Sequence, residues 1–157
     1  MNSGRITEGQ SLRGIGGWLL VLCIYLMGLV PLLAAVGMFA VWRASGGSAA
    51  LQSAVFFEAL LELGLAAFAF YAGLLLYQRR PNAVAVTKIY FITMLTLGAL
   101  VLGIVLLGLV SRFADAALAS QLRGPATATG IRQIVIAGLW LLYLERSARV
   151  RATYPQG

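Results

Sequence analysis

Residues 89–110 read IYFITMLTLGALVLGIVLLGLV, a stretch of mostly apolar side chains without a single charge. A helix needs roughly 17–25 such residues to cross the hydrocarbon core of a bilayer, so this stretch predicts a transmembrane helix. Three further apolar runs lie at 17–41, 54–77 and 126–144. The last run is the weakest, because its strongly apolar part begins only at Ile131.

The composition of the whole chain supports this interpretation. Of its 157 residues, 61% are hydrophobic and 11% are charged, whereas soluble globular proteins carry about 25% charged residues. Too few polar side chains remain to coat a water-soluble core, and the same numbers exclude a disordered chain or a disulfide scaffold. We therefore predict one all-α domain over residues 1–157, an integral membrane bundle of four transmembrane helices. The first run exceeds the 7–15 apolar residues of a signal peptide, so we expect it to be retained.

Basic residues lie mostly outside the apolar runs and predict the orientation of the helices. The formal net charge is +7. With four spans, both termini and the connection between spans two and three share one side, which holds Arg5, Arg13, Arg79, Arg80, Lys88, Arg146, Arg149 and Arg151. The opposite side holds Arg43, Arg112 and Arg123. Since Lys and Arg accumulate on the cytoplasmic side, we expect both termini to be cytoplasmic.

The ends of the runs also predict contacts with the membrane surface. Aromatic and basic side chains there are candidate interfacial anchors, namely Trp18, Trp42, Tyr77, Tyr143, Arg149 and Arg151. In a chain this apolar, the excess of positive charge favours anionic lipid headgroups over nucleic acid. We therefore expect membrane lipids as partners, with a larger membrane complex or a second copy of the chain as further candidates.

The connection between the third and fourth spans has a helical pattern of its own. Over residues 112–123 the apolar side chains fall near one face at helical spacing, while the charged and amide side chains avoid that face. Gly124 and Pro125 are typical of a helix end. We therefore predict a short amphipathic helix on the outer membrane surface. An irregular alanine-rich loop is the alternative.

Two carboxylates and one guanidinium lie inside predicted spans. Glu58 and Glu62 are one turn apart in the second span, and Arg132 lies next to Gln133 in the fourth. Counted from the cytoplasmic ends of their spans, Glu62 and Arg132 lie about 22 Å and about 18 Å deep, so their side chains can meet. Since intramembrane charges normally pair, we predict a Glu62–Arg132 pair, with Glu58 and Gln133 as secondary members. The pair either holds two spans in register or couples to protons or a substrate.

Few other residues remain to carry chemistry. The chain has no histidine, which excludes histidine-ligated metals, histidine-ligated haem and histidine general bases. Its one cysteine, Cys23, lies in an apolar run and has no disulfide partner. We predict no catalytic residue, no metal and no cofactor. Pro31 lacks the N–H that would bond the carbonyl of Met27, so we expect a kink in the first helix.

Two classes of function fit these features. The first is a non-enzymatic accessory or structural subunit that packs against a larger membrane complex or lipid. The second is a small oligomeric transporter or channel-like module that uses the intramembrane Glu–Arg pair.

The two ends of the chain carry the most specific pattern. Residues 16–20 read GGWLL, and residues 140–154 read WLLYLERSARVRATY. The chain also has a proline in the first helix, a glutamate early in the second and an arginine before the last span. Together with the two ends, these features resemble the bacterial domain-of-unknown-function family 2569. The matching positions are Gly16, Gly17, Trp18, Pro31, Glu58 or Glu62, Arg132, Trp140, Tyr143, Arg149, Val150 and Thr153. The resemblance implies a small four-span protein of the bacterial inner membrane and supplies no activity, and Glu145 departs from its pattern.

Overall fold

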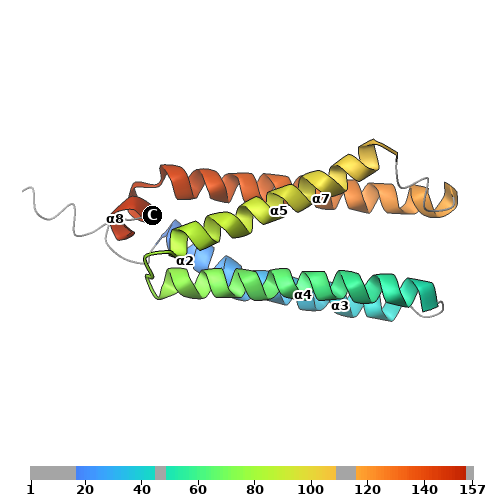
Figure 1. The fold of residues 1–157 in the computed structure, drawn as a ribbon, viewed down its shortest axis with the longest axis horizontal. Helices are drawn as coiled ribbons and strands as arrows, with labels where there is room; N and C mark the ends of the chain where they lie inside the picture. The colour runs from blue at the N-terminus through green and yellow to red at the C-terminus, as the bar shows by residue number, and fades with distance from the viewer. Residues whose placement is uncertain (1–16, 45–48, 109–115, 155–157) are drawn as a thin grey trace, which may run out of the picture. The chain divides into compact units, whose positions relative to one another are not determined.

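A computed structural model describes residues 17–44, 49–108 and 116–154, apart from some side chains. The side chains not described within these ranges are those of residues 40–42, 44, 49–55, 57, 58, 116–122, 149 and 152. The described residues form helices and contain no strand, which confirms the all-α class. In chain order the elements are α2 (Trp18–Ile24), the π-helical turn η1 (Tyr25–Leu29), α3 (Val30–Ala44), α4 (Ala49–Tyr77), α5 (Ala83–Leu106), α7 (Ala116–Arg146) and α8 (Ala148–Thr153) (Figure 1).

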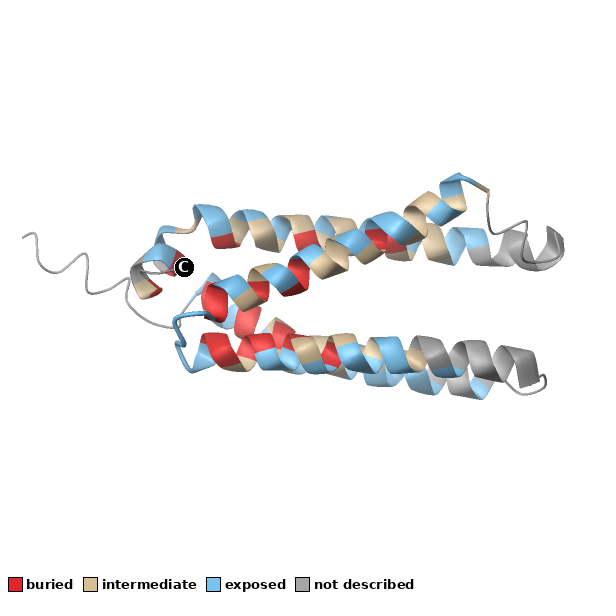
Figure 2. Cartoon of the chain, in the orientation of Figure 1, coloured by how far each residue is buried: buried red, intermediate tan, exposed pale blue. Residues whose placement is uncertain are grey.

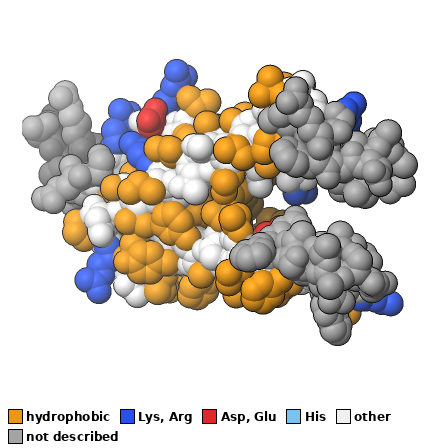
Figure 3. Space-filling view, turned by 45° about the vertical axis from the view of Figure 1, so that its right-hand side comes forward, with side chains coloured by type: hydrophobic (Ala, Val, Ile, Leu, Met, Phe, Trp, Pro, Cys, Tyr) orange, Lys and Arg blue, Asp and Glu red, His pale blue; other side chains and the backbone are white. Residues whose placement is uncertain are grey.

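Among the described residues, four helical segments are long and apolar enough to cross a membrane. They are Trp18–Phe39, Ala59–Tyr77, Ala83–Leu106 and Arg123–Arg146. The fourth has the lowest mean hydropathy, 1.3, in agreement with its weaker sequence pattern. Hydrophobic side chains spread over the described helices, while most Lys and Arg side chains lie toward the helix ends (Figure 3). The predicted number of spans is confirmed, although the third begins at Ala83, six residues before its predicted start at Ile89. The protein is a multi-pass membrane protein.

The helices group into two units, one of residues 1–87 with 148–157 and the other of residues 88–147. In the first unit, α2 and η1 pack against α4, and the buried residues gather toward the C-terminal end of α4 (Figure 2). The buried side chains of α2 and η1 follow the spacing of one helix face and are Leu19, Leu22, Cys23 and Leu26. Those of α4 are Ala66, Ala69, Ala72, Leu75 and Leu76. Small alanines on α4 allow the close backbone approach on which helix association in membranes depends.

The π-helical turn η1 ends two residues before Pro31. The N–H of Val30 donates to the carbonyl of Tyr25, five residues back, in place of the usual four. Because Pro31 has no N–H for the carbonyl of Met27 and its ring crowds that carbonyl, a wider turn just before it relieves the conflict. The kink that the sequence predicts at Pro31 stays a prediction, and the π-helical turn before it is a finding of the structure.

Gly73 of α4 lies directly against this turn. A Cβ atom placed on Gly73 would lie 2.6 Å from Cγ of Met27, closer than real Cβ contacts, and 3.0 Å from Cβ of Leu26, tighter than most of them. A Cβ atom on Gly64, nine residues earlier in α4, would meet nothing within 4 Å. The missing side chain at Gly73 therefore allows α4 and η1 to come this close.

In the second unit, α5 and α7 approach each other at two glycines. A Cβ atom on Gly98 would lie 3.1 Å from the carbonyl oxygen of Gly130, and one on Gly130 would lie 3.0 Å from the carbonyl oxygen of Gly98. Two helical turns away, the rings of Phe91 and Trp140 stack with centroids 6.4 Å apart. Trp140 also meets Tyr143 edge-on. Glycines and aromatic rings thus form the contact between these two helices.

Helix α7 runs through Pro125, so the predicted helix end at Gly124 and Pro125 is wrong. A proline removes one backbone hydrogen bond inside a helix. The residue before it usually leaves the helical conformation because its Cβ clashes with the proline ring, but Gly124 has no Cβ. The hydroxyl of Thr127 donates to the carbonyl of Arg123 at 2.7 Å, an additional bond within this turn. The helix therefore tolerates Pro125.

The predicted surface helix over residues 112–123 is consequently not a separate element. Residues 116–123 are the first turns of α7, and residues 112–115 lie outside the described residues. At 1.5 Å per residue, the 31 residues of α7 extend about 46 Å, which exceeds a hydrocarbon core of about 30 Å. A location of the first turns at the outer membrane surface stays a prediction.

Candidate functional site

The first unit holds a pocket between α3 and α4 that contains an intramembrane carboxylate. Its volume is about 320 Å³. The lining residues are Pro31, Ala34, Ala35 and Met38 from α3 and Ala59, Glu62, Leu63, Ala66, Ala67 and Phe70 from α4. A Cβ atom on Gly37 would lie 3.6 Å from Oε2 of Glu62, so the carboxylate lies over a position of α3 that has no side chain. The pocket is therefore an apolar site with one ionisable group.

Helical spacing explains how the pocket forms. The lining positions of each helix recur at intervals of three or four residues, so they lie on one face. Five of the ten are alanines, and short side chains on both helices leave the space that the pocket occupies. Glu62 lies 15 residues before Tyr77, about 22 Å along the helix and inside the hydrocarbon core. A charge at that depth is costly and is normally paired or functional.

The other predicted members of this site lie in different surroundings. Glu58 lies one turn before Glu62 in α4, and its side chain is outside the described part of the chain. Arg132 is exposed on α7, and Gln133 is half-buried beside Gly98. The Oε1 atom of Gln133 is buried without a hydrogen-bond partner among the described residues. Since Glu62 belongs to the first unit and Arg132 to the second, their pairing stays a prediction.

The candidate interfacial anchors differ in exposure. Trp18 and Tyr77 are 69% and 60% exposed, as residues in contact with lipid headgroups would be, and Arg151 is exposed on α8. Tyr143 is half-buried and packs against Trp140. The side chains of Trp42 and Arg149 lie outside what the structure describes.

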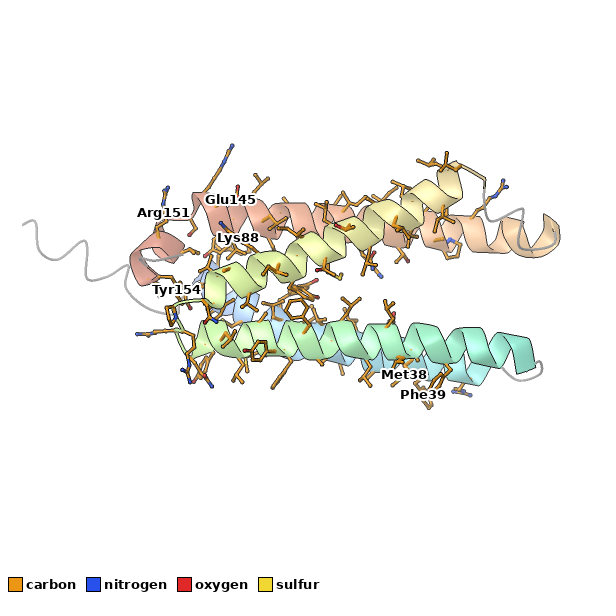
Figure 4. All side chains as sticks on the ribbon, viewed as in Figure 1. Met38, Phe39, Lys88, Glu145, Arg151 and Tyr154 are labelled. Carbon is orange, nitrogen blue, oxygen red and sulfur yellow. The ribbon has the colours of Figure 1, made fainter. Side chains whose placement is uncertain are left out.

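A buried tyrosine that the sequence did not single out closes the C-terminal end of α4. The hydroxyl of Tyr154, which is 3% exposed, donates to the backbone carbonyl of Leu76. The same carbonyl accepts the N–H of Arg79 at 3.1 Å, and the N–H of Arg80 donates to the carbonyl of Leu75 at 3.1 Å. These two backbone bonds form a Schellman motif, and Arg79 has the left-handed φ of 56° that the motif requires. Tyr154 thereby attaches the short helix α8 to the end of α4 (Figure 4).

The comparison with known families gives one match. The model of a family described as a protein of unknown function, DUF2569, matches residues 12–155. The chain belongs to the DUF2569 family. The match covers all four spans and confirms the resemblance carried by the two ends of the sequence. Neither the curated proteins nor the solved structures contain a match.

The DUF2569 motif residues at the two ends of the chain have structural roles in this member. Gly17 has a φ of 57°, and its carbonyl accepts the N–H groups of Leu20 and Val21 at 3.1 and 3.2 Å as α2 begins. A side chain would strain that conformation. At the other end, Val150 is 3% exposed, within the helix that Tyr154 attaches to α4. These parts of the DUF2569 pattern therefore serve the ends of the helices.

We expect Tyr154→Phe and Tyr154→Ala to loosen this contact in graded fashion. The phenylalanine loses one hydrogen bond, worth about 0.5–1.5 kcal/mol, while the alanine also loses the buried ring. Because the buried Cys23 is the only cysteine of this DUF2569 chain, its reaction with a maleimide reports opening of the unit. Labelling should be slowest in the parent and fastest in Tyr154→Ala. Equal rates in all three proteins would contradict the role of Tyr154.

The same bond predicts a loss of stability at high pH. Burial of the phenol raises the pKa of Tyr154 from 10.0 to about 12. A raised pKa means that the stabilisation is complete below about pH 10 and is lost as the pH rises toward about 12. The melting temperature of the parent should therefore approach that of Tyr154→Phe over this interval. A difference between the two that stays constant from pH 9 to pH 12 would refute this expectation.

Proposed function

We propose that the protein is a non-enzymatic accessory subunit of the bacterial inner membrane, with cytoplasmic termini, that packs against a larger membrane complex. In this proposal the Glu62–Arg132 pair holds the second and fourth spans in register. The observation that carries it is the position of Glu62 in an apolar pocket, about as deep in the second span as Arg132 is in the fourth. Both charges lie where low dielectric favours a partner of opposite sign.

Large apolar side chains supply the surface for the larger complex. On the first helix Leu32, Val36 and Phe39 are 57–61% exposed, and on α7 Leu139 is 62% exposed. Within lipid such surfaces gain little from apolar burial, so a protein partner would bind them through close packing. Two neighbouring residues of α3 distinguish the pocket from the outer surface. Ala35 lines the pocket, whereas Val36 is exposed and does not line it.

Site-specific photocrosslinking in native membranes tests this proposal. A photoreactive amino acid at Val36 or Leu139 should give one discrete product whose mass exceeds that of the chain by that of another protein. The same probe at Ala35, the matched neighbour, should react within the chain and leave the mass unchanged. Products from none of the three positions, or only products of twice the mass of the chain, would refute an accessory role in a larger complex.

The pocket itself supports a second candidate function. A volume of about 320 Å³ beside a carboxylate suits a small transporter or channel-like module that binds a proton or a cationic substrate at Glu62. Under this alternative, Glu62→Gln would leave the fold nearly intact and abolish a flux measured in liposomes. Under the accessory role, the parent protein would carry no such flux.

A further inference from the structure

The C-terminal end of α4 places an arginine where helices commonly have glycine. Arg79 occupies the left-handed position of the Schellman motif, with a φ of 56°. A residue with a Cβ atom is disfavoured in this conformation by roughly 1–2 kcal/mol, which is why glycine is common there. Backbone strain of this kind is maintained where the side chain or the local geometry is needed. The side chain of Arg79 is exposed and therefore contributes nothing to the core.

The backbone around this arginine is firmly held. The carbonyl of Leu76 accepts from both Arg79 and Tyr154, and the carbonyl of Arg80 accepts the N–H of Ala83 at 3.0 Å as α5 begins. A turn fixed on both sides presents the guanidinium groups of Arg79 and Arg80 from a rigid base. Arg151 is exposed on α8, which Tyr154 attaches to the same end of the unit (Figure 4).

The guanidinium groups of Arg79 and Arg80 have no carboxylate nearby among the described side chains of the first unit. The one carboxylate among them, Glu62, lies about 22 Å up α4 from Tyr77. The side chain of Arg80 donates a 3.5 Å hydrogen bond to the amide oxygen of Gln78, which is uncharged. An anion from outside the unit would therefore be attracted here.

The depth of the arginines identifies the kind of anion. Exposed Trp18 and Tyr77 lie at the same end of the unit, and exposed aromatic side chains of this kind mark the headgroup level of a membrane. Arg79 and Arg80 come two and three residues after Tyr77, which favours a position at the level of the lipid phosphates. Guanidinium groups bind phosphate oxygens through two parallel hydrogen bonds.

From this geometry we infer that Arg79 and Arg80 form a binding site for the phosphodiester headgroup of an anionic phospholipid. The site goes beyond the accessory role proposed above and does not depend on it. It explains why the strained position holds an arginine: the Schellman turn aims the side chain at the headgroup layer while Tyr154 and the backbone bonds keep the turn in place.

Native mass spectrometry of the full chain with phosphatidylglycerol or phosphatidylcholine tests this site. A basic residue near the membrane surface contributes about five-fold to the affinity for anionic lipid. We therefore expect Arg79→Gly to weaken phosphatidylglycerol binding about five-fold and Arg79→Gly with Arg80→Gln to weaken it about 25-fold. Arg43→Gln is the matched control, because Arg43 is an exposed arginine of the same unit that lies on α3 over the ring of Phe39.

Thermal melts and a competition arm complete the experiment. Arg79→Gly should melt no lower than the parent, because glycine accepts the left-handed conformation, so weaker lipid binding would not reflect unfolding. Displacement of phosphatidylglycerol by millimolar inorganic phosphate would assign the site to a soluble phosphate and overturn the lipid inference. Equal losses in Arg43→Gln and Arg79→Gly, or no preference for phosphatidylglycerol over phosphatidylcholine, would overturn it as well.

Discussion

Gly73→Ala is expected to destabilise the first unit, although alanine is the better helix former. The added Cβ atom would lie 2.6 Å from Cγ of Met27 and 3.0 Å from Cβ of Leu26, so the side chain of Met27 must change its position and Leu26 must shift by a few tenths of an ångström. Overpacking of this kind costs about 1–3 kcal/mol, of which the higher helix propensity of alanine offsets at most about 1 kcal/mol. Thermal melting in detergent should show the loss, and a larger side chain at this position should increase it.

Gly64→Ala is the matched control in the same helix. Its Cβ atom would meet nothing within 4 Å, so the melting temperature should stay the same or rise slightly. The opposite signs of the two substitutions are the critical result, because composition and hydropathy change equally in both. If Gly64→Ala and Gly73→Ala shift the melting temperature alike, the close contact between α4 and η1 is absent from the protein in solution.

The spans could be predicted from sequence because the membrane imposes a simple requirement. A backbone in hydrocarbon must satisfy its own hydrogen bonds, so an apolar run of sufficient length forms a helix whatever its neighbours are. This requirement located all four spans, including the weak fourth one. The predicted helix end at Gly124 and Pro125 was wrong because it followed a rule for helices in water-soluble proteins. In this helix, Gly124 and its surroundings tolerate the proline.

The contacts between helices could not be predicted in the same way. The chain has 18 glycines, and Gly73, Gly98 and Gly130 differ from Gly64 only in what lies opposite them. The π-helical turn has no sequence pattern beyond Pro31. Tyr154 is the last residue of the WLLYLERSARVRATY segment, and its partner is a backbone carbonyl 78 residues away, which no local pattern specifies.

The candidate site was predicted in part. The depth of Glu62 followed from its distance to Tyr77, and the structure adds the pocket around it, because that pocket depends on which alanines of α3 and α4 face each other. Single removal of either predicted partner should have the largest effect of any substitution considered. Stranding one charge in low dielectric costs about 3–5 kcal/mol, whereas removal of both charges leaves no stranded group.

Thermal melts of the parent, Glu62→Gln, Arg132→Gln and the double variant test the central claim most directly. Each single substitution should lower the melting temperature strongly, the double variant should recover much of the loss, and co-purification of the larger complex should follow stability in all four proteins. Such coupling is the signature of two groups in contact. Single effects that simply add in the double variant would show that Glu62 and Arg132 do not touch, and the predicted contact between the second and fourth spans would be wrong.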